Sequence, residues 1–163
     1  RPRRIMIPNN EEFRAGNLLK SGCCVLLNPV NCVGVMGKGL ALQFREAHPE
    51  AFTSYKEACK AGEIKPGTVH TFRLGWTTIV HFPTKDHWKD PSKLEYIAAG
   101  LENLERWIDM WSNWPEEWKP RSIAIPKLGC GLGGLSWPPV RDLILRLADR
   151  HPTFRFHIYG EAP

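Results

Sequence analysis

The chain of 163 residues predicts one domain over residues 1–163, and its apolar fraction of 42% is enough for a substantial core. The five cysteines form no C-x-x-C pair, which argues against a disulfide framework or a zinc knuckle. The sequence also has no long apolar run and no visible signal peptide, so we expect a cytoplasmic protein with no membrane partner. The formal net charge of +5 permits an acidic partner but is too small to indicate nucleic-acid binding by itself.

The chain begins with a basic stretch, residues 1–4, which we expect to be frayed. Helices are expected over residues 40–48 and 50–61, with a break near Pro49. Six segments have the pattern of strands: residues 5–8 or 12–15, then 24–28, 68–73, 77–82, 122–126 and 153–159.

Two further helices are predicted in the second half. One begins near Ser92, because Ser92 and Glu95 form a capping-box pattern ahead of apolar residues at helical spacing. The last begins after Ser136, with Pro138 in its first turn, and ends before Pro152. Strands alternating with helices predict a three-layer α/β/α domain with a mixed central sheet of about six strands. Ligands of such folds bind at the carboxyl ends of the strands.

Two glycine-rich loops, residues 28–39 and 126–135, each follow a predicted buried strand and precede a predicted helix. Glycine lets the backbone approach an anion closely and point successive N–H groups at it, and a helix N-terminus adds positive charge. Asn28 and Asn31 in the first loop can hold backbone or ligand hydroxyl groups without adding charge. A turn would explain one such loop. Two loops at matching strand ends predict a ligand with a diphosphate flanked by sugars.

Neither loop meets all the requirements of a standard nucleotide-binding motif. Gly34 lies only three residues before Gly37, and Gly39 replaces the hydroxyl residue of a Walker sequence, which disfavours a magnesium-dependent NTPase. The second loop formally matches G-x-G-x-x-G from Gly129 to Gly134, but no acidic partner follows at the expected spacing. No His, Cys or carboxylate cluster has metal-ligand spacing, so we expect neither a metal nor a cofactor.

Both loops resemble the macrodomain family, whose members bind ADP-ribose. Residues 28–31, Asn-Pro-Val-Asn, match the family's asparagine-containing strand end, and residues 129–134 match its phosphate-binding second loop. The run over residues 33–44 is most similar to the branch that contains the DarG antitoxin and the terminal ADP-ribose glycohydrolase. The likeness extends from residue 13 to residue 159.

This resemblance implies an enzyme that removes ADP-ribose. DarG-type members cleave it from thymidine in DNA and so reverse a DNA ADP-ribosyltransferase toxin, whereas the vertebrate glycohydrolase mainly acts on acidic side chains. The implied partners are ADP-ribose, ADP-ribosylated single-stranded DNA and a DarT-like toxin. Two alternatives remain: hydrolysis of ADP-ribose esters on protein carboxylates or of O-acetyl-ADP-ribose, and a non-catalytic ADP-ribose reader.

Lys85 matches the catalytic lysine of this branch, and it favours an enzyme over a reader. It can act as an acid, a nucleophile or an electrostatic stabiliser. Asn31 is the second catalytic candidate. The vertebrate enzyme has an aspartate where this chain has Gly133, which favours the DarG type. Asn17 replaces the family's usual adenine-binding aspartate, and its amide oxygen can accept the same bond.

The resemblance implies an extended ADP-ribose site. Cys130 is interpreted as a packed side chain rather than a nucleophile, because no histidine partner is evident. Trp88 and Lys89 interleave an aromatic with a basic residue, a pattern that can bind nucleic acid or simply anchor a loop. Tyr159 is expected to stack on adenine or to pack at the rim. The expected ADP-ribose-binding residues are Asn17, Leu18, Asn28, Gly34, Val35, Met36, Gly37, Lys38, Gly39, Thr84, Gly129, Cys130, Gly131, Leu132, Gly133, Gly134 and Tyr159.

Overall fold

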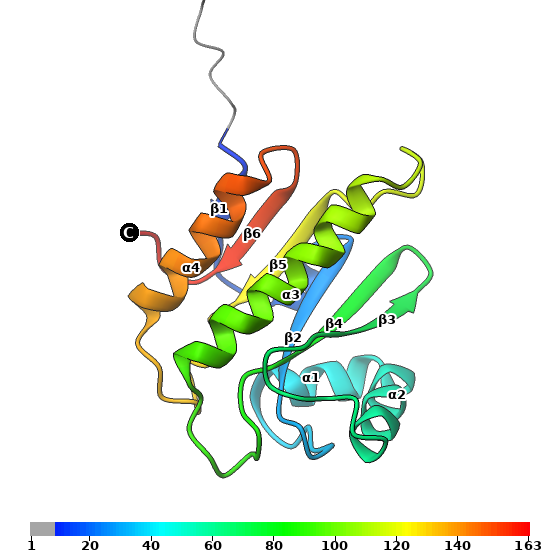
Figure 1. Ribbon diagram of the computed structural model, residues 1–163, viewed down its shortest axis with the longest axis vertical. Coiled ribbons are helices and arrows are strands. Elements are labelled where there is room, and N and C mark those ends of the chain that lie inside the picture. The colour runs from blue at the N-terminus through cyan, green and yellow to red at the C-terminus, as the bar shows by residue number, and fades with distance from the viewer. Residues whose placement is uncertain (1–8) are drawn as a thin grey trace, which may run out of the picture.

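The computed structural model describes residues 9–163 as a six-stranded sheet between two layers of helices (Figure 1). The strands are β1 (Glu11–Phe13), β2 (Val25–Val30), β3 (His70–Leu74), β4 (Thr77–Pro83), β5 (Ser122–Pro126) and β6 (Arg155–Tyr159). The helices are the 3₁₀ turn η1 (Leu18–Lys20), α1 (Gly39–Ala47), α2 (Pro49–Lys60), α3 (Leu94–Ser112) and α4 (Trp137–Arg150). The predicted mixed sheet between helices is confirmed.

The strand order is β1-β6-β5-β2-β4-β3. Every neighbouring pair is parallel except β3 and β4, which form an antiparallel hairpin at one edge. Because β5, β2 and β4 are parallel neighbours, their carboxyl ends meet at one edge of the sheet. The loops that leave these three ends therefore come together, although they are far apart in sequence.

Alternating side chains of β2 contribute to two separate cores. Val25 and Leu27 pack on the face covered by α3 and α4, the two helices at the front of Figure 1. Leu26 packs on the opposite face with Phe44 of α1. Helix α3 faces the first core with an apolar stripe at helical spacing: Ile97, Leu101, Leu104, Ile108 and Trp111.

Gly100 sets how closely α3 lies on β4. A Cβ atom at this position would lie 2.4 Å from Cζ of Phe82, far inside van der Waals contact. Only glycine allows the helix to pack directly on the phenylalanine ring. The α3–β4 spacing therefore depends on one missing methyl group.

Most predicted elements are observed with small changes at their ends. β5 has the bounds predicted for it, and β1 corresponds to the predicted strand over residues 12–15. The alternative first strand, residues 5–8, and the basic stretch, residues 1–4, lie outside the described residues. The predicted capping box at Ser92 is wrong. Helix α3 begins at Leu94 with Lys93 as its N-cap residue, and no side chain caps it. Ser92 instead donates its N–H to the carbonyl of Gly133, at 3.0 Å, because the chain here packs on the second loop.

Candidate functional site

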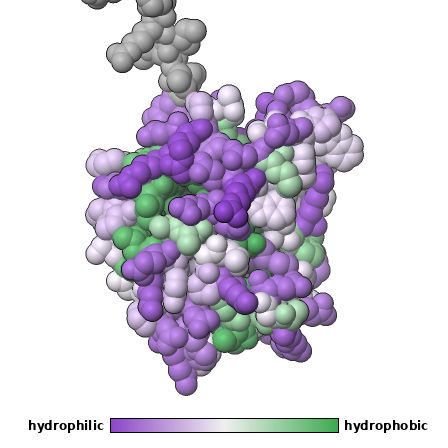
Figure 2. Space-filling model, viewed as in Figure 1, coloured by the Kyte–Doolittle hydropathy of each residue, from purple (hydrophilic) through white to green (hydrophobic). Residues whose placement is uncertain are grey.

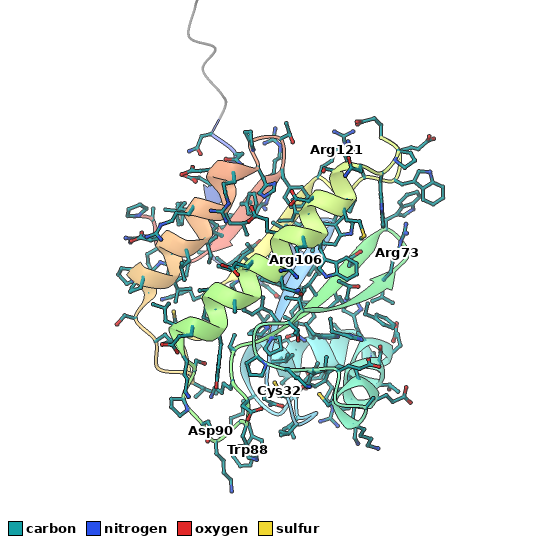
Figure 3. The ribbon with its side chains drawn as sticks, viewed as in Figure 1. Cys32, Arg73, Trp88, Asp90, Arg106 and Arg121 are labelled. Carbon is teal, nitrogen blue, oxygen red and sulfur yellow. The ribbon has the colours of Figure 1, made fainter. Side chains whose placement is uncertain are left out.

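A cleft of about 1190 Å³ opens at the carboxyl ends of β2, β4 and β5. Figure 3 labels Cys32, Trp88 and Asp90 at this end of the molecule, and Arg73 and Arg121 at the opposite end. The cleft is lined by the first loop, the segment after β4 and the second loop, with these residues: Pro29, Val30, Asn31, Val35, Gly37, Lys38, Gly39, Leu40, Ala41, Thr84, Lys85, Trp88, Lys89, Asp90, Pro91, Pro126, Lys127, Gly129, Cys130, Gly131, Leu132, Gly133 and Gly134.

Asn31 holds the first loop in its curve. Its Oδ1 accepts the N–H groups of Val33, at 3.0 Å, and Val35, at 3.4 Å, while its Nδ2 donates to the carbonyl of Val35, at 2.8 Å. The hydroxyl of Tyr55 in α2 lies 2.7 Å from the carbonyl oxygen of Asn31 and 2.8 Å from its Oδ1. The side chain predicted as a second catalytic group therefore shapes the loop, and α2 anchors it.

Three residues predicted to bind the ligand line neither this cleft nor the smaller pocket that adjoins it. Asn28 is fully buried, with its Nδ2 3.8 Å from Sδ of Met36 and 3.3 Å from Nδ1 of His81. Met36 is also buried, in the small core around Tyr55. Gly34 turns toward α2 with φ of +87°. The prediction failed for Asn28 because β2 continues to Val30, which leaves Asn28 inside the sheet.

The second loop is packed against the start of α3. A Cβ atom at Gly133 would lie 2.2 Å from Oγ of Ser92 and 2.4 Å from the carbonyl oxygen of Gly129, so no side chain fits there. Gly129 itself has φ of +74°, a conformation that glycine adopts readily. At Gly131, by contrast, a Cβ atom would meet nothing within 4 Å. The loop thus has one side closed by protein and one side open to the cleft.

Lys85 follows β4 and lies between the two loops. Its Nζ donates to the carbonyl oxygens of Trp88 and Leu132, both at 3.4 Å, so it connects its own segment to the second loop. Within residues 9–163 Lys85 forms no ion pair. Thr84 is buried beside it and donates its N–H to the carbonyl of Val30, at 2.9 Å. An ammonium group without a protein carboxylate is therefore available to an anionic or developing negative charge in the cleft.

A smaller pocket of about 480 Å³ adjoins the cleft and shares Leu40 and Pro126 with it. Asn17 and Tyr159, whose predicted contact is the adenine, and Leu18, which was predicted to bind ADP-ribose, all line this pocket together with Gly16 and Gln43. Oδ1 of Asn17 already accepts the N–H of Leu19, at 3.0 Å, and caps η1. A carboxamide oxygen has two lone pairs, so one remains for a ligand.

The thiols of the two loops, one in each, are poor nucleophiles. Burial raises the pKa of Cys32 to about 12, and burial also raises the pKa of Cys130. Both side chains therefore remain protonated near neutral pH. The thiol of Cys32 contacts the carbonyl oxygen of Lys85 at 3.5 Å, which connects the first loop to the lysine segment.

The sequence did not single out several residues that the fold brings to this region. Asp90 is the one carboxylate among the cleft-lining residues that the structure describes, and Lys127 adds a cation at the base of the second loop. Tyr55 and Ser92 support the two loops from behind. Asp90 directly follows Lys89, Lys127 lies inside the predicted second loop, and Ser92 was assigned only as a helix cap. Tyr55 carried no local signal, because its role comes from a contact across the fold.

Among residues 9–163, no three His, Cys, Asp or Glu side chains are grouped as metal ligands. No helix in that range combines the length and apolar character needed to cross a membrane.

An α/β domain with two glycine-rich loops over one cleft, and a cation between them, has the form of a domain that binds a phosphate-containing ligand. The Macro domain family model matches residues 27–144. The chain therefore belongs to the macrodomain family.

Curated relatives are similar over nearly the whole chain. A DNA ADP-ribosyl glycohydrolase of Mycobacterium tuberculosis is 45% identical over 151 residues, which cover 90% of this chain and 41% of the relative. A protein of the same name from Thermus aquaticus is 43% identical over 136 residues, covering 81% of this chain and 36% of the relative. The chain thus spans about two fifths of the length of these relatives.

Solved structures match just as broadly. The macrodomain of Mycobacterium tuberculosis DarG is 41% identical with a TM-score of 0.86, covering 93% of this chain and 98% of that one. Thermosipho africanus DarTG in complex with ADP-ribose is 33% identical with a TM-score of 0.80, covering 99% of this chain and 45% of that one.

Proposed function

We propose that this macrodomain binds ADP-ribose and hydrolyses the bond that joins it to thymidine in DNA. The observation that carries the proposal is the position of Lys85, with its Nζ in the cleft between two glycine-rich loops. A domain that only binds ADP-ribose needs the two loops alone. An ammonium group beside them that forms no ion pair with a described carboxylate can also act on the bond between the bound sugar and its substituent. The names of the Mycobacterium tuberculosis and Thermus aquaticus relatives support the choice of a DNA conjugate.

The two cavities fit an extended dinucleotide-like ligand. The smaller pocket, with Tyr159 and Asn17, takes the adenosine. The diphosphate lies between the two loops, where glycines allow close approach, and Lys38 and Lys127 add positive charge. The remaining ribose then reaches Lys85. The complex of the Thermosipho africanus protein with ADP-ribose supports this assignment of the ligand.

Hydrolysis requires a group that acts on charge at the anomeric carbon. The hydroxyl of water adds to that carbon, the bond to the base nitrogen breaks, and the departing base takes up a proton. As an ammonium, Lys85 can stabilise the negative charge that develops on the departing base or donate the proton to it, and as a neutral amine it can attack the carbon itself. The raised thiol pKa values of Cys32 and Cys130 argue against a cysteine nucleophile in this step.

A DNA ADP-ribosyltransferase is the proposed counterpart of this activity. The Thermosipho africanus relative, named a DNA ADP-ribosyl transferase-DNA ADP-ribosyl glycohydrolase fusion protein, is 34% identical over 163 residues, covering 88% of this chain and 40% of the relative. Such a pairing supports a toxin of the DarT type as the source of the substrate, with both proteins acting in the cytoplasm.

The test is a side-by-side incubation. Purified protein is given ADP-ribosylated thymidine in single-stranded DNA, ADP-ribosylated glutamate in a protein, and O-acetyl-ADP-ribose, and released ADP-ribose is measured. Turnover of the DNA conjugate at the highest kcat/KM is expected. Faster release from glutamate or from the acetyl ester would replace the DNA assignment, and tight ADP-ribose binding without turnover of any conjugate would make the domain a reader.

A further inference from the structure

Apolar side chains are concentrated at the mouth of the cleft. Leu132 at the tip of the second loop is 74% exposed and Trp88 after β4 is 50% exposed, and Val33 and Val35 in the first loop are exposed as well. Apolar side chains reach the surface at the lower end of the molecule in Figure 2, the end where these loops lie in Figure 1. Exposed apolar side chains gathered around a cavity indicate a binding surface.

Lys85 fixes the geometry of this mouth. Its ammonium donates to the carbonyl oxygens of both Trp88 and Leu132, at 3.4 Å each. The two most exposed of these four apolar residues are therefore the ones whose backbone carbonyl groups bracket the lysine. A group attached to a sugar at Lys85 therefore lies close to these two residues, which line the same cleft.

We propose that Trp88 and Leu132 form a clamp for the nucleobase that leaves during hydrolysis. An indole and a branched aliphatic side chain present the surfaces on which a flat ring packs, whereas a hydrated carboxylate gains little from them. The clamp rests on the proposed function, and it explains how one ADP-ribose cradle selects a DNA conjugate over a protein carboxylate.

The surroundings of Trp88 fit a base that is part of a DNA strand. Nζ of Lys89 lies 5.1 Å from the centroid of the indole ring, and the ring of His87 lies 5.3 Å from it. A cation beside the aromatic surface can pair with the phosphate that adjoins a stacked base.

The experiment compares Trp88→Ala and Leu132→Ser with a matched control, Trp76→Ala. Trp76 is 76% exposed but lies in the β3–β4 turn, at the amino end of β4 and away from the cleft. For each protein, kcat/KM is measured on ADP-ribosylated single-stranded DNA and on O-acetyl-ADP-ribose, whose distal ribose carries an acetyl group in place of a thymine base. We expect each clamp variant to lose about tenfold or more on DNA relative to its loss on the acetyl ester, and the control to match the wild type.

A binding measurement keeps the clamp testable without turnover. In a Lys85→Gln background, whose side-chain amide still offers an N–H donor to the carbonyl oxygens of Trp88 and Leu132, calorimetry compares the affinity for an ADP-ribosylated thymidine oligonucleotide with that for free ADP-ribose. The base should add affinity, and Trp88→Ala or Leu132→Ser should remove that increment. Equal losses on both substrates, or an oligonucleotide bound no better than ADP-ribose, overturn the clamp. A wild type that hydrolyses no DNA conjugate overturns the proposed function instead, while the binding increment still decides the clamp.

Discussion

The hydroxyl of Tyr55 lies 2.8 Å from Oδ1 of Asn31, and this hydrogen bond joins helix α2 to the loop after β2. Tyr55→Phe removes this bond and the one from the same hydroxyl to the carbonyl oxygen of Asn31, at an expected cost of about 1–3 kcal/mol in the free energy of unfolding. The first loop should also loosen, and ADP-ribose affinity should fall about fivefold. Urea unfolding and calorimetry measure the two effects.

Tyr96→Phe is the matched control for Tyr55→Phe, because the hydroxyl of Tyr96 forms no hydrogen bond with any described residue. It should leave both stability and affinity at wild-type values. If Tyr55→Phe binds ADP-ribose as tightly as the wild type, the anchoring role of α2 is wrong.

Lys85→Ala should abolish release of ADP-ribose from thymidine DNA while ADP-ribose affinity stays within about tenfold, or 1.4 kcal/mol. A group that acts on charge at the anomeric carbon contributes mainly in the transition state, and the backbone of the two loops is not altered. Lys65→Ala, at an exposed position before β3, serves as the control and should keep full activity. Near-normal turnover by Lys85→Ala would make Asn31 the better catalytic candidate.

Two neighbouring glycines should respond differently to the same substitution. Gly133→Ala places a methyl group 2.4 Å from the carbonyl of Gly129 and 2.2 Å from Oγ of Ser92, so the second loop must move. We expect a loss of about 1–3 kcal/mol in stability and weaker ADP-ribose binding. Gly131→Ala meets nothing within 4 Å and should keep the fold, whereas a bulky residue there should block the approach of the diphosphate.

Thermal unfolding and calorimetry on these three variants separate a folding defect from a binding defect. If Gly133→Ala is as stable and binds as tightly as Gly131→Ala, the second loop is not held against Ser92 as described. Because the backbone contact with Gly129 remains, Ser92→Gly should restore Gly133→Ala only in part.

Stability should fall on mild acidification because of His81. Burial, followed by the charge of His70, lowers the pKa of His81 from its ordinary value of 6.5 to about 3. The unfolded chain therefore binds a proton that the folded protein resists, so stability is full above pH 6.5 and is lost as the pH falls toward 3. From the pKa values of 6.5 and about 3, His81 alone should cost about 2 kcal/mol at pH 5 relative to neutral pH.

Urea unfolding at pH 7.5 and pH 5 tests this expectation. His81→Gln should make the free energy of unfolding less dependent on pH, because the variant lacks the buried imidazole that takes up a proton on unfolding. His87→Gln, outside the core, should keep the wild-type dependence. An unchanged slope in His81→Gln would assign the effect to other histidines, such as His70 and His157, whose pKa values burial also lowers.

We expect turnover to continue in EDTA, because the chemistry is assigned to Lys85 and to the backbone of the two loops. The measurement is release of ADP-ribose from thymidine DNA with and without chelator, after dialysis to remove bound ions. Complete loss of activity, restored by zinc or magnesium, would show that a metal ion takes part in the reaction.

The layered fold could be predicted because each strand and helix carries its own local pattern. The stripe from Ile97 to Trp111 predicts α3 without any tertiary contact, and the apolar run around Leu26 predicts a buried strand. The two loops were found for a similar reason, since glycines mark positions where the backbone approaches something closely.

The details of the site could not be predicted in the same way. Ser92 has the sequence context of a helix cap, but its side chain packs beside Gly133, more than forty residues away. Asn28 has the composition of a strand end, but β2 runs two residues further and buries it. Tyr55 is one of several aromatic residues in its region and gains its role only when α2 packs on the first loop. Each of these roles is created by a contact across the fold.

Because Gly100 has no Cβ atom, substitutions at this position should disturb the cleft although Gly100 does not line it. A Cβ atom there would lie 2.4 Å from the ring of Phe82, so alanine at this position must lift α3 from β4. The segment just before α3 carries Ser92, which donates a hydrogen bond to Gly133, while β4 leads directly to Lys85. In a survey of random variants, substitutions at Gly100 would therefore be recovered among the inactive proteins, and the defect would resemble that of a residue in the cleft although the position touches no ligand.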